Sequence, residues 1–245
     1  MKMLIAAIIL LSLAVQLQAS TLTVLGTDSL GKQLIYDSAL DITWYDYTHG
    51  SDIWQNQVNW ASNLSVNFNG QSITGWRLPQ TLPVNGSSYN YDYSSDGSTD
   101  HSYNISAPSS AYPGSTASEM AYLYYTVLGN NGYFDISGNP LLGSGVGVGL
   151  INTGPFTDLT GGLYWSGTEY AVRPSAAWVF YAYDGYQGSL DKENSQGMSA
   201  LAVLPGRVEI APVPEPSTML LFGVGLSILG VMRFGRRVVD TLTLW

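Results

Sequence analysis

Residues 176–183 read Ala-Ala-Trp-Val-Phe-Tyr-Ala-Tyr, an uninterrupted run of apolar and aromatic side chains. Small, branched and aromatic residues in a run of this length are typical of a β-strand. Ala176, Trp178, Phe180 and Ala182 would project from one face, and the residues between them from the other. We therefore predict that this run is a strand of the same sheet as strands at 163–168 and 199–204.

Two segments nearer the N-terminus have helical spacing instead. The first helix is expected to begin at Asp52, with Gln55 as its capping-box partner, and the second follows a capping box from Thr116 to Glu119. Further strands are predicted at residues 21–24, 32–36 and 40–44. Two helices embedded among short antiparallel strands predict an α+β domain.

Five short motifs occur in order along this domain, at residues 42–44 (ITW), 75–79 (GWRLP), 118–123 (SEMAYL), 164–169 (YWSGTE) and 200–203 (ALAV). As an ordered set they resemble the domain at the C-terminus of collagen-like bacterial adhesins, over residues 34–208. The resemblance implies a C-type-lectin-like fold and glycan binding. The related formylglycine-generating enzymes depend on cysteines for catalysis, which this chain lacks, so the resemblance implies a binding or structural role.

Composition narrows the possible partners of residues 20–211. This segment has 16 acidic and 5 basic residues, a formal charge of −11. Nucleic acid and anionic bilayer surfaces need a basic patch, so we expect neither as a partner. Because the chain has no cysteine, disulfides, zinc–thiolate sites and cysteine nucleophiles are excluded.

The first 19 residues are predicted to be a secretory signal peptide. Lys2 precedes the apolar run 3–15, and Ala19 offers a small residue at the cleavage site. Without this leader and without the C-terminal segment described next, residues 20–211 remain as one domain with an adequate core.

A second signal stands at the other end of the chain. Residues 213–216 read Val-Pro-Glu-Pro, the uncharged run 217–232 follows, and arginines come directly after it. An apolar run with basic residues on one side is typical of a membrane segment. The residues of this predicted signal are Val213, Pro214, Glu215, Pro216, Arg233, Arg236 and Arg237.

This arrangement resembles the PEP-CTERM sorting signal of Gram-negative bacteria that make exopolysaccharide. The resemblance implies export through the inner membrane, a transmembrane sorting helix within residues 212–237, and recognition by an exosortase that removes the helix. The protein would then reach the cell surface or extracellular matrix. The family usually ends at its arginines, whereas this chain continues over residues 238–245.

One acidic loop has the spacing of a calcium site. Asp92, Ser94, Asp96 and Asp100 occupy positions one, three, five and nine of an EF-hand loop, and Gly97 occupies position six. Position twelve is a tyrosine rather than the bidentate glutamate. Weak calcium binding and a solvated acidic loop without metal are therefore both open.

A ligand surface is predicted where two of the strands would pair as a hairpin. Tyr164, Trp165 and Glu169 lie at the end of the first strand, and Tyr183, Asp184 and Tyr186 lie where the chain turns after the second. Aromatic rings and carboxylates suit a neutral, hydroxylated ligand such as a glycan. The other tryptophans are assigned to the core.

These observations predict a non-catalytic exported protein that associates with extracellular polysaccharide. The sequence contains neither a nucleophile motif nor a cofactor motif, and calcium is the one metal ion for which it suggests a site. Two alternatives remain: a structural adhesin without a defined glycan site, and a glycan hydrolase that uses carboxylates such as Glu169 and Asp184.

Overall fold

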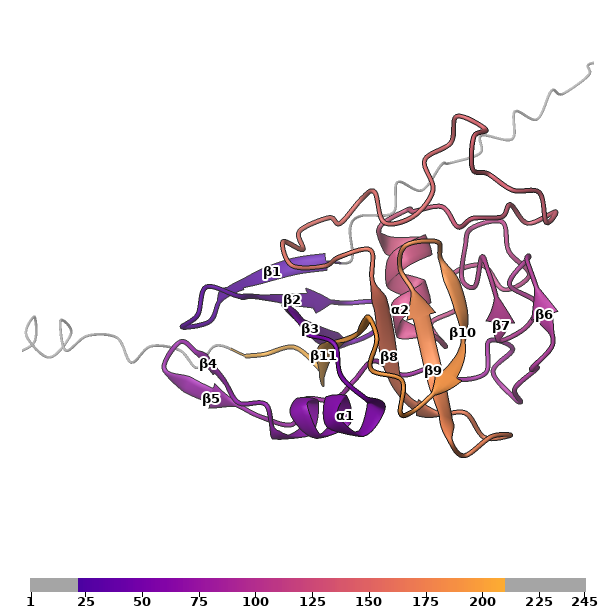
Figure 1. Cartoon of the computed structure of the whole chain (residues 1–245). Coiled ribbons are helices and arrows are strands. Elements are labelled where there is room, and N and C mark those ends of the chain that lie inside the picture. The colour runs from indigo at the N-terminus through magenta and orange to yellow at the C-terminus, as the bar shows by residue number, and fades with distance from the viewer. Residues whose placement is uncertain (1–21, 210–245) are drawn as a thin grey trace, which may run out of the picture. The chain divides into compact units, whose positions relative to one another are not determined.

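The strand predicted at 176–183 lies inside a nine-stranded sheet in the computed structural model, which describes residues 22–209 (Figure 1). The strand order is β1-β2-β3-β11-β8-β9-β10-β7-β6, and a separate hairpin consists of β4 and β5. The strands are β1 (Leu22–Thr27), β2 (Gln33–Asp37), β3 (Ile42–His49), β4 (Val66–Phe68), β5 (Gln71–Ile73), β6 (Tyr93–Ser94), β7 (His101–Ser102), β8 (Leu163–Glu169), β9 (Ala176–Tyr181), β10 (Tyr186–Asp191) and β11 (Met198–Pro205). The helical segments are α1 (Trp54–Asn63), α2 (Glu119–Ala121) and the π-helical turn η1 (Tyr122–Val127). The described residues are thus mostly β-sheet with two short helical regions.

The centre of the sheet is buried on both faces. Ala177 and Val179 of β9 belong to a core on the face covered by α1, whereas Phe180 belongs to a core on the face covered by α2 and η1. Strands β8 and β11 alternate between the same two cores. A strand with both faces covered is apolar throughout, which explains the continuous apolar run in β9.

Most strand pairs are antiparallel, as predicted, but two are parallel. β11 runs parallel to β8, with Met198 opposite Leu163, and β6 runs parallel to β7. The last strand, β11, inserts between β3 and β8 and joins the early part of the sheet to the later part. The prediction that all the strands are antiparallel is wrong at these two positions: β8 and β11 are distant in sequence, and the loop between β6 and β7 returns the chain in the same direction.

Both helices form where expected, but their first residues differ from the capping predictions. α1 begins at Trp54 and its N-cap is Ile53; the carboxylate of Asp52 accepts from the backbone N–H of Ile53 and from the side-chain amide of Asn56, and so caps no backbone N–H of the first helical turn. Ser118 is the N-cap of α2, where its hydroxyl accepts from the N–H of Ala121. Glu119 does not complete a capping box, because its carboxylate binds another segment.

Some short strands form where the sequence predicts turns. Asn69 and Gly70, which are expected to end a helical unit, form the tight turn between β4 and β5 with φ values of +52° and +76°. Positive φ at both central residues is the requirement of a type I′ hairpin turn. The sequence predicts no strand at β10 either, because Gln187 and Ser189 interrupt its apolar pattern.

Among residues 22–209, no helix has the length and apolarity needed to cross a membrane. The predicted signal peptide and the predicted sorting helix both lie outside the described residues.

Candidate functional site

Five tyrosine rings gather where β9, β10 and β6 approach one another. We call Tyr93, Tyr103, Tyr181, Tyr183 and Tyr186 the tyrosine cluster. Within it, the ring centroids of Tyr103 and Tyr186 are 5.0 Å apart, and those of Tyr181 and Tyr186 are 5.4 Å apart. The ring centroid of Tyr93 lies 6.3 Å from that of Tyr186, and the centroid of Tyr183 lies 5.8 Å from that of Tyr181.

The register of β9 and β10 brings two of these rings together. Tyr181 and Tyr186 are directly opposite each other in the antiparallel pair, so both project from the same face. This is the face that α1 covers nearer the middle of the sheet, where it packs against β11 and β8.

Tyr125 of η1 packs against the turn between these strands and bonds to it. Gly185 has φ +82°, and a Cβ atom there would lie 2.3 Å from the hydroxyl oxygen of Tyr125. That hydroxyl donates to the carbonyl of Gly185 at 2.9 Å. Asp184 tightens the turn by accepting from the N–H of Tyr186 at 3.0 Å. The turn is therefore rigid, and it presents Tyr183 outward.

The loop with calcium-site spacing supplies the other two rings. The hydroxyls of Ser94 and Ser102 are 2.7 Å apart, and the N–H of Gly97 donates to the Ser102 hydroxyl at 3.1 Å. These bonds close the loop between its two ends, which carry Tyr93 and Tyr103. The loop thus positions rings of the tyrosine cluster.

One carboxylate accompanies the rings. Asp184 accepts from the hydroxyl of Tyr103 at 3.3 Å, and none of the ion pairs among the described residues involves it. Burial raises the pKa of Asp184 above its ordinary value and raises the pKa of Tyr181 to about 12. Because burial and the Asp184 charge also raise the pKa of Tyr103, these phenols remain hydrogen-bond donors at neutral pH.

Two of the rings are open to solvent. Tyr93 is 60% exposed and Tyr183 is 49% exposed, whereas Tyr103, Tyr181 and Tyr186 are half-buried. Large exposed aromatic side chains held in place by neighbouring rings form a surface that can bind the apolar face of a ligand at little entropic cost.

The prediction that Tyr164 and Trp165 face a ligand is wrong. Both side chains have no exposed surface, and they point into opposite cores. The indole N–H of Trp165 donates to the carbonyl of Asp52 at 3.2 Å. Both faces of their strand, β8, are covered by these cores, so neither ring can reach a sugar.

The hairpin also separates the two predicted carboxylates. Glu169 is opposite Ala177 near the start of β9, whereas Asp184 lies beyond Tyr181 at the other end of that strand. Ala177 and Tyr181 alone are about 13 Å apart at the usual rise of a strand. The Glu169 carboxylate pairs with Lys192, which follows the end of β10 remote from Asp184, whereas two carboxylates that act on one glycosidic bond lie at most roughly 9.5 Å apart. The other two predicted residues, Asp184 and Tyr186, do lie close together in the structure.

The oxygens predicted for calcium point to different partners. Asp100 is fully buried, and its two oxygens accept from the N–H groups of Val84 and Asn90, both at 2.7 Å. Asp96 accepts from the N–H of Ser98, and Ser94 bonds within the loop. Asp92 is exposed. Across residues 22–209, no group of three or more His, Asp or Glu side chains is arranged to hold a metal ion.

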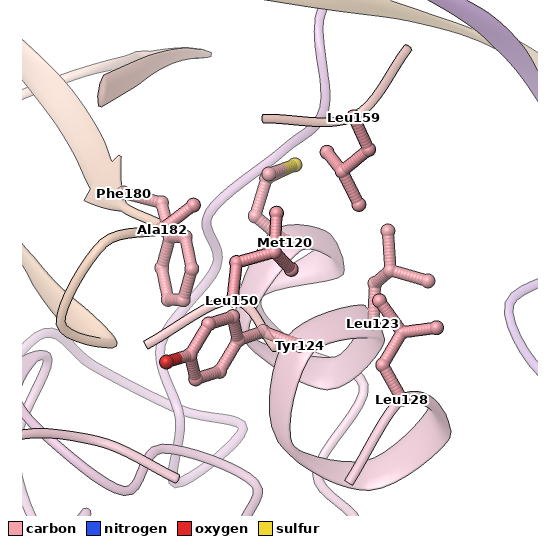
Figure 2. Close-up of a pocket in the computed structure, with 8 residues that line it drawn as sticks. All are labelled: Met120, Leu123, Tyr124, Leu128, Leu150, Leu159, Phe180 and Ala182. Atoms are coloured by element: carbon pink, nitrogen blue, oxygen red, sulfur yellow. The ribbon is translucent and has the colours of Figure 1, made fainter. Parts of the chain in front are cut away.

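A small cavity beneath the helical region is part of the packing and not a ligand site. Figure 2 shows the side chains that line it, which come from α2, η1, β9 and neighbouring loops and point toward one another. Its volume is about 10 Å³, the lower limit for a single water, and its lining is almost entirely apolar. The lining residues are Met120, Leu123, Tyr124, Leu128, Leu150, Leu159, Phe180 and Ala182.

Sequence reasoning misses three members of the tyrosine cluster, Tyr93, Tyr103 and Tyr181. Tyr181 alternates with Tyr183 along the chain, which is a usable signal, because two such rings share a face of a strand. Tyr93 and Tyr103 belong to a loop whose closure depends on serine hydroxyls, and no local pattern indicates that closure.

Comparison with known proteins identifies one segment. Residues 212–237 match the PEP-CTERM protein-sorting motif, which confirms the sequence prediction over the same residues. No curated protein and no solved structure is detectably similar to the chain, so the lectin-like resemblance over residues 34–208 has no match among them. The chain carries the C-terminal signal of exported proteins that exosortase recognises and sorts to the cell surface.

Proposed function

We propose that this protein is a non-catalytic surface or matrix protein that associates with neutral extracellular polysaccharide through the tyrosine cluster. The carrying observation is the exposure of Tyr93 and Tyr183 beside the carboxylate of Asp184. Aromatic rings bind the apolar faces of sugars, and a carboxylate accepts hydrogen bonds from their hydroxyl groups. The sorting motif supports the surface location in this proposal, since it directs proteins to the cell surface.

Charge supports a neutral ligand rather than an anionic one. Among the described basic residues, Lys32 pairs with Asp158, Arg77 with Glu119 and Lys192 with Glu169. Arg207 lies over the ring of Tyr36, and Arg173 acts on His101 and Tyr170, which are not members of the tyrosine cluster. The resemblance to a C-type-lectin-like adhesin domain is consistent with the same ligand class, and we retain that fold assignment as part of the proposal.

The test is affinity electrophoresis of the purified full chain through gels that contain dextran, levan or a galactan. We expect retardation by at least one polysaccharide, and weaker retardation of Tyr93→Ala and Tyr183→Ala. Each ring is expected to contribute on the order of 1 kcal/mol, so the double variant should bind about tenfold or more weakly.

Tyr112→Ala is the matched control, because Tyr112 is also exposed but lies outside the cluster. Equal loss in the control and in the cluster variants would refute the site. Passage of the wild-type chain without retardation in every gel would instead favour a structural adhesin that has no glycan site.

A further inference from the structure

A larger pocket adjoins the tyrosine cluster on the side of η1. Its volume is about 400 Å³, within the range of roughly 300–1,000 Å³ found for small-molecule sites. Two loop segments, 104–109 and 129–141, form most of its wall, and Tyr125 of η1 also lines it.

The lining combines hydrogen-bonding and apolar groups. Asn131 is exposed, and it uses one amide N–H for the carbonyl of Gly147 while its amide oxygen remains unbonded among the described residues. The hydroxyl of exposed Ser109 also has no partner in that part of the chain. Ile136 is 42% exposed and supplies an apolar surface.

This chemistry selects the ligand class. No described lysine, arginine or histidine lines the pocket, so a phosphate or carboxylate group would find no countercharge among residues 22–209. Asp135 is the single carboxylate of the described lining; one of its oxygens accepts from the N–H groups of Ser137 and Asn139, and the other accepts from the side-chain amide of Asn139. Free amide and hydroxyl groups beside an apolar wall fit a neutral molecule with several hydroxyl groups.

The pocket and the tyrosine cluster share a boundary. Tyr103 of the cluster directly precedes Asn104 of the pocket, and its ring centroid lies 5.1 Å from that of Phe134, which precedes Asp135. Tyr125 lines the pocket and also donates to Gly185, in the turn that carries Asp184. One extended ligand could therefore contact both features.

We infer that this pocket is a subsite for one terminal or side-branch sugar of the polysaccharide whose chain lies across the tyrosine cluster. The inference rests on the proposed function, because the neighbouring rings are taken to hold the same glycan. The pocket encloses a compact unit, whereas the exposed rings of Tyr93 and Tyr183 suit a longer stretch of chain.

The test uses two probes with the full chain. Saturation-transfer NMR measures binding of the methyl glycosides of glucose, galactose and mannose, and affinity electrophoresis measures binding of the three polysaccharides. Ser109→Trp is designed to fill the pocket, and we expect it to abolish the signal of the bound monosaccharide. Asn131→Ala should weaken monosaccharide binding by roughly three- to tenfold, the loss expected from one hydrogen bond.

Tyr93→Ala serves as the reciprocal control. It should leave monosaccharide binding unchanged while it weakens polysaccharide binding. Polysaccharide binding without a monosaccharide signal, or a signal that both Ser109→Trp and Asn131→Ala retain, would overturn the subsite and leave the proposed function intact. Absence of any polysaccharide binding by the wild-type chain would overturn the proposed function itself. Circular dichroism shows whether Ser109→Trp is folded, and Asn131→Ala decides the outcome if it is not.

Discussion

Gly97 occupies a position where the backbone leaves no room for a side chain. Its φ is +75°, and a Cβ atom there would lie 2.5 Å from the carbonyl oxygen of Asn104. Its N–H also donates to the Ser102 hydroxyl. The glycine therefore closes the loop that carries Tyr93 and Tyr103, a role different from the calcium-loop glycine that its spacing predicts.

We expect Gly97→Ala to lower the free energy of unfolding by about 2–4 kcal/mol, because strain at positive φ adds to a collision with backbone atoms. Gly86→Ala is the matched control, since Gly86 has φ +74° but a Cβ atom added there would have no described neighbour within 4 Å. Gly86→Ala should lower the free energy of unfolding by about 1 kcal/mol, because it introduces only the strain of a side chain at positive φ. Urea denaturation measures both, and equal losses would contradict the collision.

His101 is a second residue with an unusual environment. Its ring stacks on Tyr170 at 5.2 Å and meets Trp178 edge-on at 5.0 Å. Its Nε2 is buried and has no hydrogen-bond partner among the described residues. Burial, and then the charge of Arg173, lower the pKa of His101 below its ordinary value of 6.5.

This lowered pKa predicts an acid-sensitive contribution to stability. The folded state binds a proton less readily than the unfolded state, so the contribution is complete above pH 6.5 and is lost as the pH falls toward the folded pKa. His101→Phe should remove this component and keep the ring contacts. Urea denaturation from pH 7.5 to pH 5 measures the difference between the two proteins, and a difference that does not change with pH would contradict the assignment.

At the level of secondary-structure elements, Arg77 and Glu119 join the segment before β6 to the start of α2. The guanidinium donates to both oxygens of Glu119, at 2.8 and 2.7 Å, and the N–H of Gln80 donates to one of them at 2.7 Å. The backbone of Arg77 also bonds with Val203 of β11. The sequence motifs at residues 75–79 and 118–123 are therefore joined by one bidentate ion pair.

Loss of this pair should be costly because the Glu119 side chain is only 10% exposed. We expect Glu119→Ala to reduce the free energy of unfolding by about 2–4 kcal/mol, as the guanidinium loses its partner. Glu169→Ala breaks the pair with Lys192, in which Glu169 is 60% exposed, and should cost less than about 1 kcal/mol. Thermal denaturation of both variants tests the contrast, and a similar shift in the two would contradict it.

Across the described unit as a whole, one sheet separates two large hydrophobic cores, and a smaller third cluster consists of Tyr170, Ala176 and Trp178. Trp165 belongs to the core on the α1 side, whereas its neighbour Tyr164 belongs to the core on the η1 side. Because the central strands contribute to both cores at alternate residues, neither core can lose its packing without the other. We therefore expect a single cooperative unfolding transition.

Substitution of Trp165 tests this view and separates packing from binding. Trp165→Ala should cost about 3–5 kcal/mol, the usual range for a buried aromatic residue, with coincident transitions by tryptophan fluorescence and far-UV circular dichroism. Tyr93→Ala should change stability by about 1 kcal/mol or less, since its ring is largely exposed. A stable Trp165→Ala variant that has lost glycan binding would contradict the assignment of this residue to the core.

Features that depend on neighbours along the chain can be recognised in the sequence of this protein. The sorting motif at 212–237 is recognisable because its parts are contiguous, and β9 and β11 are recognisable because strands buried on both faces are largely apolar along their length. The accessibility of the aromatic residues, by contrast, is set by the three-dimensional fold. Trp165 and Tyr183 both follow strand-like patterns, yet one is fully buried and the other is 49% exposed. The physical reason is that exposure depends on which strands flank a residue and on contacts between distant segments, such as the bond between Tyr103 and Asp184 across 81 positions.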